Sequence, residues 1–546
     1  MRLRTTLLLW VPPLLGIALF LAPVGSWTHL GTALIGDILP DELSFIWIWD
    51  RLSGNFFSDN PLFDGRAFYP YTESLLSSET TFGCSLIYHA FFLLVQNRAL
   101  SYNLTILFLF WLNYRCMFFF VKLFLNEYAA AIAATVFAFS LSRLSQIGHA
   151  HMIPQFGFPF FFYALFKFQE TRKWSYAFSV GTCLALQFYF SVNLGLMLML
   201  SILPLAAFEL HSLLKERDWR KAKGYALAIA SFAAVSLPIS YSYYRVSKDN
   251  NWKRSVGEAR PYSTNIKGFL VVPERHRYAG VFAPFIRYQE GARHEKCLFF
   301  GFSVFLLAFL GFRKFRQYSR HSPEARYWFR VCVTSAVFLT LLAWGTNAGL
   351  YNLLFYIVPG MSGIRVPARF GLSLLFLVAI AAAYGGYVLN ERLSKKQLAA
   401  AGLLLGLVFW LDTQVQIPIQ LVPDFNGNTA FLKATENRFP VFYIYEGLHE
   451  AEADYMYYSL DHNHPIANGY AGFMPPDNQQ LRETVLRLLK TKNAAELPLV
   501  KKTGLRYLVL DKTRLPGPTA VEYREFLKQH TELQYQDSRF ETFYIP

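Results

Sequence analysis

Residues 5–25 read TTLLLWVPPLLGIALFLAPVG, and the polar stretch behind this apolar run opens with Gly36-Asp37-Ile-Leu-Pro-Asp41-Glu42. A run of about 20 apolar residues is long enough to cross a bilayer as a helix. It follows two arginines, as the core of a signal peptide would, but it is interrupted by Pro12-Pro13 and is longer than such a core usually is. We therefore interpret it as an uncleaved first membrane span, with a cleavable signal as the alternative.

The composition of the whole chain agrees with a membrane protein. Of 546 residues 53% are hydrophobic and only 16% are charged, whereas a soluble protein has about a quarter of its residues charged. The net charge of +15 gathers in short loops beside apolar segments, which indicates membrane topology and not nucleic-acid binding. These numbers exclude a disordered chain and predict an α-helical polytopic membrane protein.

Twelve apolar segments are candidates for membrane spans. The weakest is 82–96, which is short and contains Cys84, Ser85 and His89, so we expect it to lie in the outer interface as an amphipathic helix. That leaves about 11 transmembrane helices. The candidates are 5–25, 82–96, 100–124, 128–142, 153–168, 175–190, 191–210, 224–244, 297–312, 328–344, 369–389 and 398–416.

The basic loops set the sides of the membrane. Segments 215–223, 313–330 and 390–396 carry the strongest basic character, so the positive-inside rule places them in the cytoplasm together with the N-terminus. An even number of crossings must then precede 215–223, which is why 82–96 does not cross. We expect the chain to lie in the cytoplasmic (inner) membrane of a bacterium. The loops 26–99 and 246–296 then lie on the outer face of that membrane.

The chain therefore divides into a transmembrane domain, 1–416, and a small extracytoplasmic α/β domain, 417–546, where polar residues and strand-like runs take over. We expect strands at 441–445, 507–511 and 540–545, with helices near 477–491 and 519–530.

Acids at the start of the first outer loop are the candidate catalytic groups. Carboxylates at a membrane face cost desolvation unless they have a partner or a task, so Asp37, Asp41 and Glu42 are predicted to be catalytic, with Asp37 first. Glu79 is a candidate for substrate binding. The aromatic run 45–49 suits an interfacial belt. A hydrated loop acid without a function is the alternative for Asp37.

Imidazoles and guanidinium groups on the same outer face are the candidate substrate-binding groups. His149 and His151 are expected to hydrogen-bond a sugar hydroxyl or a phosphate, with metal binding as the alternative. Arg365 and Arg369 lie outside, against the positive-inside trend, and arginine binds phosphate bidentately. Snorkelling to lipid headgroups is the alternative for both arginines.

Together these motifs resemble the GT-C superfamily of membrane glycosyltransferases, which use polyprenyl-phosphate-linked sugars. More closely, the chain is similar to a group of bacterial polytopic membrane proteins that includes the YfhO-type family. The local signatures are Gly36-Asp37, Phe68-Tyr-Pro70, Gly148-His149, Pro359-Gly-Met-Ser-Gly-Ile-Arg-Val-Pro-Ala-Arg369 and the segment 457–473. The resemblance covers the whole chain.

The resemblance implies that Asp37 stands where the family has its catalytic or acceptor-activating carboxylate. Metal-dependent members carry Asp-x-Asp or Asp-x-Glu in the second outer loop, but this chain has Gly148-His149-Ala-His151 there and no acid. We therefore expect no metal cofactor; a divalent ion is conceivable but is not supported by an acidic motif. Within 463–470, a glycan-facing turn and a purely structural turn are both open.

The expected reaction is sugar transfer with inversion at the anomeric carbon. Asp37 takes the proton of the acceptor hydroxyl, and Arg365 or Arg369 stabilises the departing polyprenyl phosphate. The acceptor is an envelope glycan, lipid or protein. Two alternatives remain: a transporter or flippase of lipid-linked sugars, and a non-catalytic envelope assembly protein. The neighbouring acids titrate together, so sequence alone leaves open whether Asp41, Glu42 or Glu79 replaces Asp37 as the base.

Overall fold

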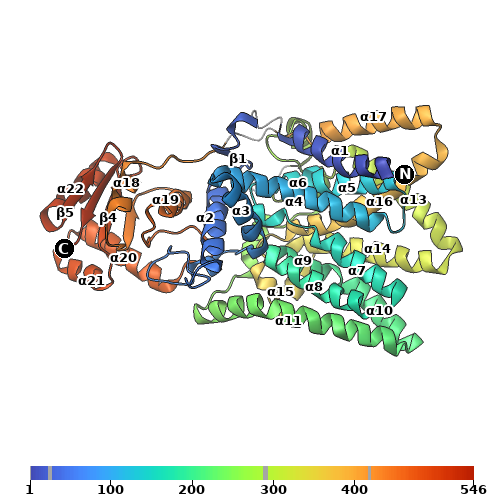
Figure 1. Ribbon diagram of the computed structural model, residues 1–546, viewed down its shortest axis with the longest axis horizontal. Coiled ribbons are helices and arrows are strands. Elements are labelled where there is room, and N and C mark those ends of the chain that lie inside the picture. Colours follow the sequence, from blue (N-terminus) through green and yellow to red (C-terminus); the bar gives the residue numbers. More distant parts are fainter. Residues whose placement is uncertain (1, 22–26, 287–292, 416–419) are drawn as a thin grey trace.

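The computed structural model describes residues 2–21, 27–286, 293–415 and 420–546. Most of the chain is helical. A long bundle of helices occupies one end of the molecule, and a smaller region built around a β-sheet occupies the other, with α2 (Leu39–Phe56) between them (Figure 1). The N-terminus lies in the bundle and the C-terminus in the sheet region.

Every predicted apolar segment overlaps at least one helix. Among the residues that the structure describes, four helices are long and apolar enough to cross a membrane, or five if the bent pair α9–α10 forms one span. The count of 11 crossings stays a prediction. The bounds are α1 Arg2–Leu21, α3 Phe82–Val95, α4 Arg98–Val121, α5 Glu127–Phe139, α6 Leu141–Leu144, α7 Gly157–Thr171, α8 Trp174–Phe190, α9 Val192–Ser201, α10 Leu203–Glu216, α11 Trp219–Asp249, α12 Ala279–Ile286, α13 Phe302–His321, α14 Pro323–Ala343, α15 Leu350–Ile357, α16 Phe370–Arg392 and α17 Lys395–Asp412.

The expectation of one helix over 191–210 is wrong. The segment bends by 41° between α9 and α10, where Pro204 stands in the first turn of α10. Proline has no amide hydrogen and its ring clashes with the carbonyl of the preceding turn, so it favours the start of a helix and bends or breaks a helix that continues through it.

Small residues bring the central helices of the bundle into close contact. A Cβ atom at Gly311 of α13 would overlap the backbone of Ala381 in α16, and one at Gly385 of α16 would overlap the backbone of Leu307. Lipid tails are as apolar as leucine, so membrane helices associate through this kind of close backbone packing. The backbones of α13 and α16 are therefore in direct contact along this part of the bundle.

The first outer loop contains a long helix that the sequence analysis missed. α2 begins with Pro40 in its first turn and has Asp41 and Glu42 there too, a favourable start because acids complement the positive end of the helix dipole. Its aromatic side chains are not an interfacial belt: Trp47 and Trp49 are 2% and 0% exposed. Trp49 packs against Tyr88 of α3 and Tyr102 of α4, and Trp47 lies against the backbone of Gly65 in the same outer loop.

The sheet region has the predicted strands. β3 (Val441–Ile444) pairs in parallel with β4 (Tyr507–Asp511), β4 in antiparallel with β6 (Phe540–Tyr544), and β6 with β5 (Glu532–Gln536). The helices are α18 Gly427–Ala434, α19 Glu452–His462, α20 Pro476–Thr491, α21 Leu497–Lys502 and α22 Gly517–His530. A two-residue pairing of β1 (Ala33–Leu34) with β2 (Gln420–Leu421) ties this region to the first outer loop. The sequence analysis did not predict β5, α18, α19 or α21.

One hydrophobic core continues from the bundle through α2 into the face of the sheet that α19 covers. Three guanidinium groups fix the C-terminal end of α19: Arg51 donates to Ser459 O (2.7 Å), Arg98 to Leu460 O (3.3 Å) and Arg66 to Asn463 O (3.2 Å). Cations suit the carbonyl end of a helix. The domain division at 416/417 and the outer placement of this region stay predictions.

The segment 463–470 forms a structural turn. Asn463 ends α19 in the left-handed conformation (φ +59°), and the buried Asn468 side chain bridges the backbone of β3 by accepting from Tyr443 N (2.7 Å) and donating to Tyr443 O (2.9 Å). His462 and His464 are fully buried. These contacts favour the structural interpretation over a glycan-facing turn.

Candidate functional site

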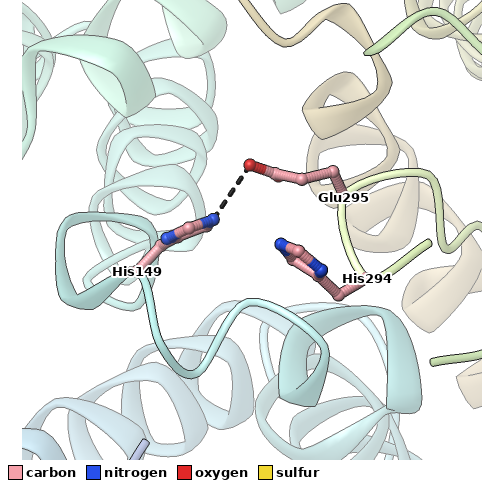
Figure 2. Close-up of side chains that lie close together, drawn as sticks. All are labelled: His149, His294 and Glu295. Atoms are coloured by element: carbon pink, nitrogen blue, oxygen red, sulfur yellow. Dashed lines mark hydrogen bonds and ion pairs between the residues drawn. The ribbon is translucent and has the colours of Figure 1, made fainter. Parts of the chain in front are cut away.

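Side chains from five separate segments meet where α2 begins. His149 lies in the loop between α6 and α7, and its ring stands between two carboxylates. Its Nδ1 is 2.9 Å from Asp41 Oδ2. Its Nε2 is 2.9 Å from Glu295 Oε1, the contact that is dashed in Figure 2. Both nitrogens therefore donate, which requires the charged imidazolium. Burial alone would lower the pKa of His149, but Glu295 and Asp41 outweigh it and raise this pKa to about 9.

Glu295 also binds Arg369 in a bidentate pair. Arg369 Nε donates to Glu295 Oε2 at 2.9 Å, and Nη2 donates to Oε1 at 2.6 Å. The third guanidinium nitrogen, Nη1, is 3.1 Å from Nε2 of His151, which accepts as a neutral ring. Burial would raise the pKa of Glu295, but Arg369 and His149 hold it well below its usual range. Burial, followed by the charge of Arg369, lowers the pKa of His151 well below its usual value.

Asp41 is the best-paired acid of the first outer loop. Besides His149, it accepts a hydrogen bond at Oδ1 from the Tyr470 hydroxyl at 2.7 Å. Burial would raise its pKa, but the bonds from His149 and Tyr470 lower it. Asp41 is therefore fixed in the ionised state by groups from two other parts of the chain.

Asp37 and Glu42 are held differently. Glu42 accepts from Ile38 N at 3.0 Å, and burial together with the neighbouring Asp37 and Asp41 raises its pKa to about 8, so it is mostly protonated at neutral pH. Burial also raises the pKa of Asp37, against the opposing effect of His294 and His149. Oδ1 of Asp37 is buried and has no hydrogen-bond partner among the described residues. Oε2 of Glu42 also lacks a partner among the described residues, so what distinguishes Glu42 from Asp37 is that its carboxyl group is mostly protonated.

Two glycines of the quoted motifs allow this close packing. A Cβ at Gly148 would lie 2.5 Å from Asp37 Oδ1, and a Cβ at Gly36 would overlap the Glu42 carboxyl group. The Gly-Asp and Gly-His dipeptides therefore have a steric reason, because any larger residue would displace an acid of the site.

The other predicted binding residues lie at the edge. Glu79 caps the start of α9 by accepting from Ser191 Oγ and Asn193 N, both at 2.9 Å, and burial raises its pKa to about 7. Arg365 is exposed, and its guanidinium carbon lies 5.1 Å from the ring centre of Tyr262. Within the described residues Arg365 forms no hydrogen bond or ion pair.

Sequence reasoning missed three members of the site: His294, Glu295 and Tyr470. His294 and Glu295 lie in the long outer loop 246–296, where the polar run Arg293-His294-Glu295 does not indicate which other residues it contacts. Tyr470 belongs to the segment 457–473, but nothing in that sequence indicates that its hydroxyl group binds an acid of the first outer loop. Only the fold shows that they reach His149 and Asp41.

His149, His294 and Glu295 are also a possible metal-binding group, since their ligand atoms lie within 4.8 Å of one another (Figure 2). Two imidazoles and a carboxylate are typical zinc ligands. Burial lowers the pKa of His294, which keeps that ring neutral and able to ligate. The residues fit a zinc ion provided that His149 loses its Nε2 proton. Glu295 supplies, from another loop, the acid that the second outer loop lacks.

Comparisons with known proteins identify the fold. No protein-family model matches the chain, and no curated protein matches its sequence. The oligosaccharyltransferase of Archaeoglobus fulgidus in the apo form superposes with a TM-score of 0.53 and 14% identity, over 99% of this chain and 74% of that one. The same enzyme in complex with Zn and sulfate gives 0.50, again at 14% identity and with the same coverage. ArnT from Cupriavidus metallidurans in the apo state gives a TM-score of only 0.41 at 10% identity, over 98% of this chain and 97% of that one.

The chain therefore shares the fold of this oligosaccharyltransferase, as the resemblance predicts, and its long apolar helices are those of a multi-pass membrane protein.

Proposed function

We propose that this chain is a glycosyltransferase that moves a sugar from a polyprenyl-phosphate donor to an envelope glycan, lipid or protein on the outer face of the cytoplasmic membrane. The observation that carries this proposal is the half-buried Asp37, whose Oδ1 is buried without a partner among the described residues and which lies near the charged His149, in a fold shared with an oligosaccharyltransferase. His149 and Arg369 both bind Glu295 and are the cationic groups of the site. A base next to a cluster of positive charge is the minimum that transfer from a phosphate requires.

Asp37 is the best candidate for the base. Both oxygens of Asp41 already accept hydrogen bonds, and Glu42 is mostly protonated, so neither is ready to take a proton. A general base needs a free lone pair and a pKa near the working pH, and a raised pKa moves Asp37 toward that range.

The arginines have separate tasks in this proposal. Arg365 is exposed and unpaired, so it binds the donor phosphate, whereas the buried Arg369 is held by Glu295 and His151 and acts through its charge. In the reaction the acceptor oxygen forms a bond to the anomeric carbon while the bond from that carbon to the phosphate oxygen breaks. The acceptor proton passes to Asp37, and polyprenyl phosphate leaves.

A zinc-type ion, if bound, would be held by His149, His294 and Glu295 and would supply Lewis-acid stabilisation of phosphate charge. One of the similar structures contains Zn and sulfate. Without an ion, His149 and Arg369 are the positive groups of the site, and the assignment of Asp37 as base is the same in both cases.

The test compares wild type with Asp37→Asn and with Asp59→Asn, an exposed acid of the same loop. Purified proteins in lipid receive radiolabelled polyprenyl-phosphate sugars and envelope extract, and transferred label is counted. We expect Asp37→Asn to lose about a hundredfold or more, as when a general base is removed, and Asp59→Asn to match wild type. Equal transfer by Asp37→Asn and wild type would refute Asp37 as the base. Donor movement across the membrane without transfer would instead indicate a transporter, and normal envelope assembly by an inactive chain would indicate an assembly protein.

A further inference from the structure

A narrow apolar slot lies inside the helix bundle, away from the candidate site. Its volume is about 300 Å³, and it runs between α4, α7, α14 and α16. The lining is mostly aromatic and includes Phe120, Phe158, Phe162, Phe166, Trp328 and Phe376. No acid or base of the candidate site contributes to it.

The slot is long for its volume. On α14 the lining residues extend from Glu324 to Leu339, which at 1.5 Å per residue is about 22 Å along the helix. On α16 they extend from Ser373 to Tyr384. One leaflet of a bilayer has a hydrocarbon depth of about 15 Å, half of the usual core. A slender apolar slot of this length matches a single hydrocarbon chain and not a compact ligand.

One end of the slot is closed and the other is open. Ser335, Leu339 and Ser373 at one end are 6%, 2% and 1% exposed, and Ser373 follows Arg369 by about one helical turn. At the other end Glu324 is exposed, and Ser322 and Ala325 are half-buried. The closed end therefore faces the candidate site, so a lipid chain enters from the opposite end, with its headgroup left outside.

The open end lies in the most basic part of the bundle. It is next to the turn between α13 and α14, at the far end of the bundle from α2 (Figure 1). Segment 313–330 contains six lysines and arginines against one acid, Glu324. Most of these basic side chains are exposed. Basic sites between membrane helices bind the headgroups of anionic phospholipids.

We propose that the slot holds one acyl chain of a resident anionic phospholipid, with its phosphate against the basic segment 313–330. The phospholipid is separate from the sugar donor, because the closed end blocks passage of a phosphate toward Arg369. This site is independent of the proposed function.

The test is a lipid-retention experiment on the full-length chain. Delipidated protein is equilibrated with vesicles of equal parts phosphatidylglycerol and phosphatidylcholine, repurified, and its bound lipid is measured by mass spectrometry. Ser335→Trp fills the slot, whereas Val337→Trp places the same side chain on the same helix at a position that is 55% exposed. We expect wild type and Val337→Trp to retain phosphatidylglycerol and Ser335→Trp to lose it. Replacing Arg313, Arg316 and Arg320 with glutamine should abolish the preference over phosphatidylcholine.

Equal retention by Ser335→Trp and Val337→Trp would overturn the proposal, as would equal binding of the two phospholipids by wild type. Preferential displacement of phosphatidylglycerol by added polyprenyl phosphate would assign the slot to the carrier lipid instead.

A second measurement does not depend on the folding of a slot variant. The fluorescence of Trp328, obtained as the difference between wild type and Trp328→Phe, is recorded in vesicles with brominated acyl chains. Bromine on phosphatidylglycerol should quench it more strongly than the same amount on phosphatidylcholine; equal quenching would contradict a resident anionic lipid.

Discussion

Replacing Glu295 with glutamine should destabilise this protein more than any exposed charge change. Glu295 is 4% exposed and binds both Arg369, by two hydrogen bonds of 2.9 and 2.6 Å, and His149, at 2.9 Å. The neutral amide keeps the shape of the side chain. It leaves the buried guanidinium of Arg369 without its carboxylate partner and the buried imidazolium of His149 with Asp41 as its one carboxylate partner.

The size of the effect follows from the pKa of His149. That pKa is about 9 instead of 6.5, and at 1.36 kcal/mol per unit the difference corresponds to roughly 3 kcal/mol of stabilisation of the charged ring. Removal of one partner from a buried ion pair costs about 3–5 kcal/mol. We therefore expect Glu295→Gln to lower the free energy of unfolding by about 3 kcal/mol.

The assay is denaturant unfolding in detergent, with Glu391→Gln as the control. Glu391 pairs with Lys314 at 3.2 Å on the exposed surface, with a carboxylate 37% exposed, so its loss should cost about 1 kcal/mol or less. Glu295→Gln combined with Arg369→Met should recover part of the loss, since the unpaired guanidinium is gone. The reasoning is refuted if the two single variants lose the same amount, or if the double variant is the least stable of all.

Three further predictions follow from the same site. The pKa of His149 is raised to about 9, so the charged ring stabilises the folded protein fully below about pH 6.5, and this stabilisation is lost as pH rises through about 9. The pKa values of Asp41 and Glu295 are lowered, so the stabilisation that these two carboxylates contribute is lost as pH falls. The free energy of unfolding, measured across pH, should therefore fall on both the acid and the alkaline side, and His149→Gln should reduce the fall on the alkaline side. Tyr470→Phe removes the 2.7 Å bond to Asp41 and should cost about 1.5–3 kcal/mol of unfolding free energy, whereas Tyr318→Phe, on the exposed surface of α13, should cost nothing measurable. Zinc binding, measured by calorimetry, should weaken in His294→Ala but not in His321→Ala, which is exposed; equal affinities would exclude this ligand set.

Local sequence patterns predicted most of the helices and strands. They did not predict which side chains of distant loops contact one another. The apolar runs became helices because each buries a continuous apolar surface, and the strands at 441–445 and 507–511 contain the same kind of local signal. The bend before α10 had a local signal too, Pro204, which the apolar length of the segment outweighed. Trp47 and Trp49 were misplaced because an interfacial aromatic and a buried one have the same local pattern.

The candidate site shows the same limit. The sequence pointed to Asp37, Asp41 and His149, but the partner that organises them is Glu295, which stands 146 residues beyond His149 in a long loop. Nothing periodic surrounds Glu295, and its neighbours are as polar as any loop surface. Tyr470 is farther still, 429 residues from the carboxylate that it binds. Contacts at such separations depend on how α2 and the sheet region pack, which local propensity does not encode.

The pairing at this site explains why three adjacent acids are not equivalent. Asp41 and Glu295 balance His149 and Arg369, two negative against two positive charges, so the paired cluster is neutral as a whole. Glu42 adds no charge while it is protonated, and Asp37 is left as the acid whose charge has no hydrogen-bonded counterpart. Under the proposed reaction a donor phosphate brings further negative charge to this neutral cluster. A nearby negative charge favours protonation of a carboxylate, so donor binding itself would strengthen Asp37 as the group that takes the acceptor proton. Transfer should therefore require the donor to bind before Asp37 acts, and in Arg365→Gln the loss should be in donor affinity more than in the rate at saturating donor.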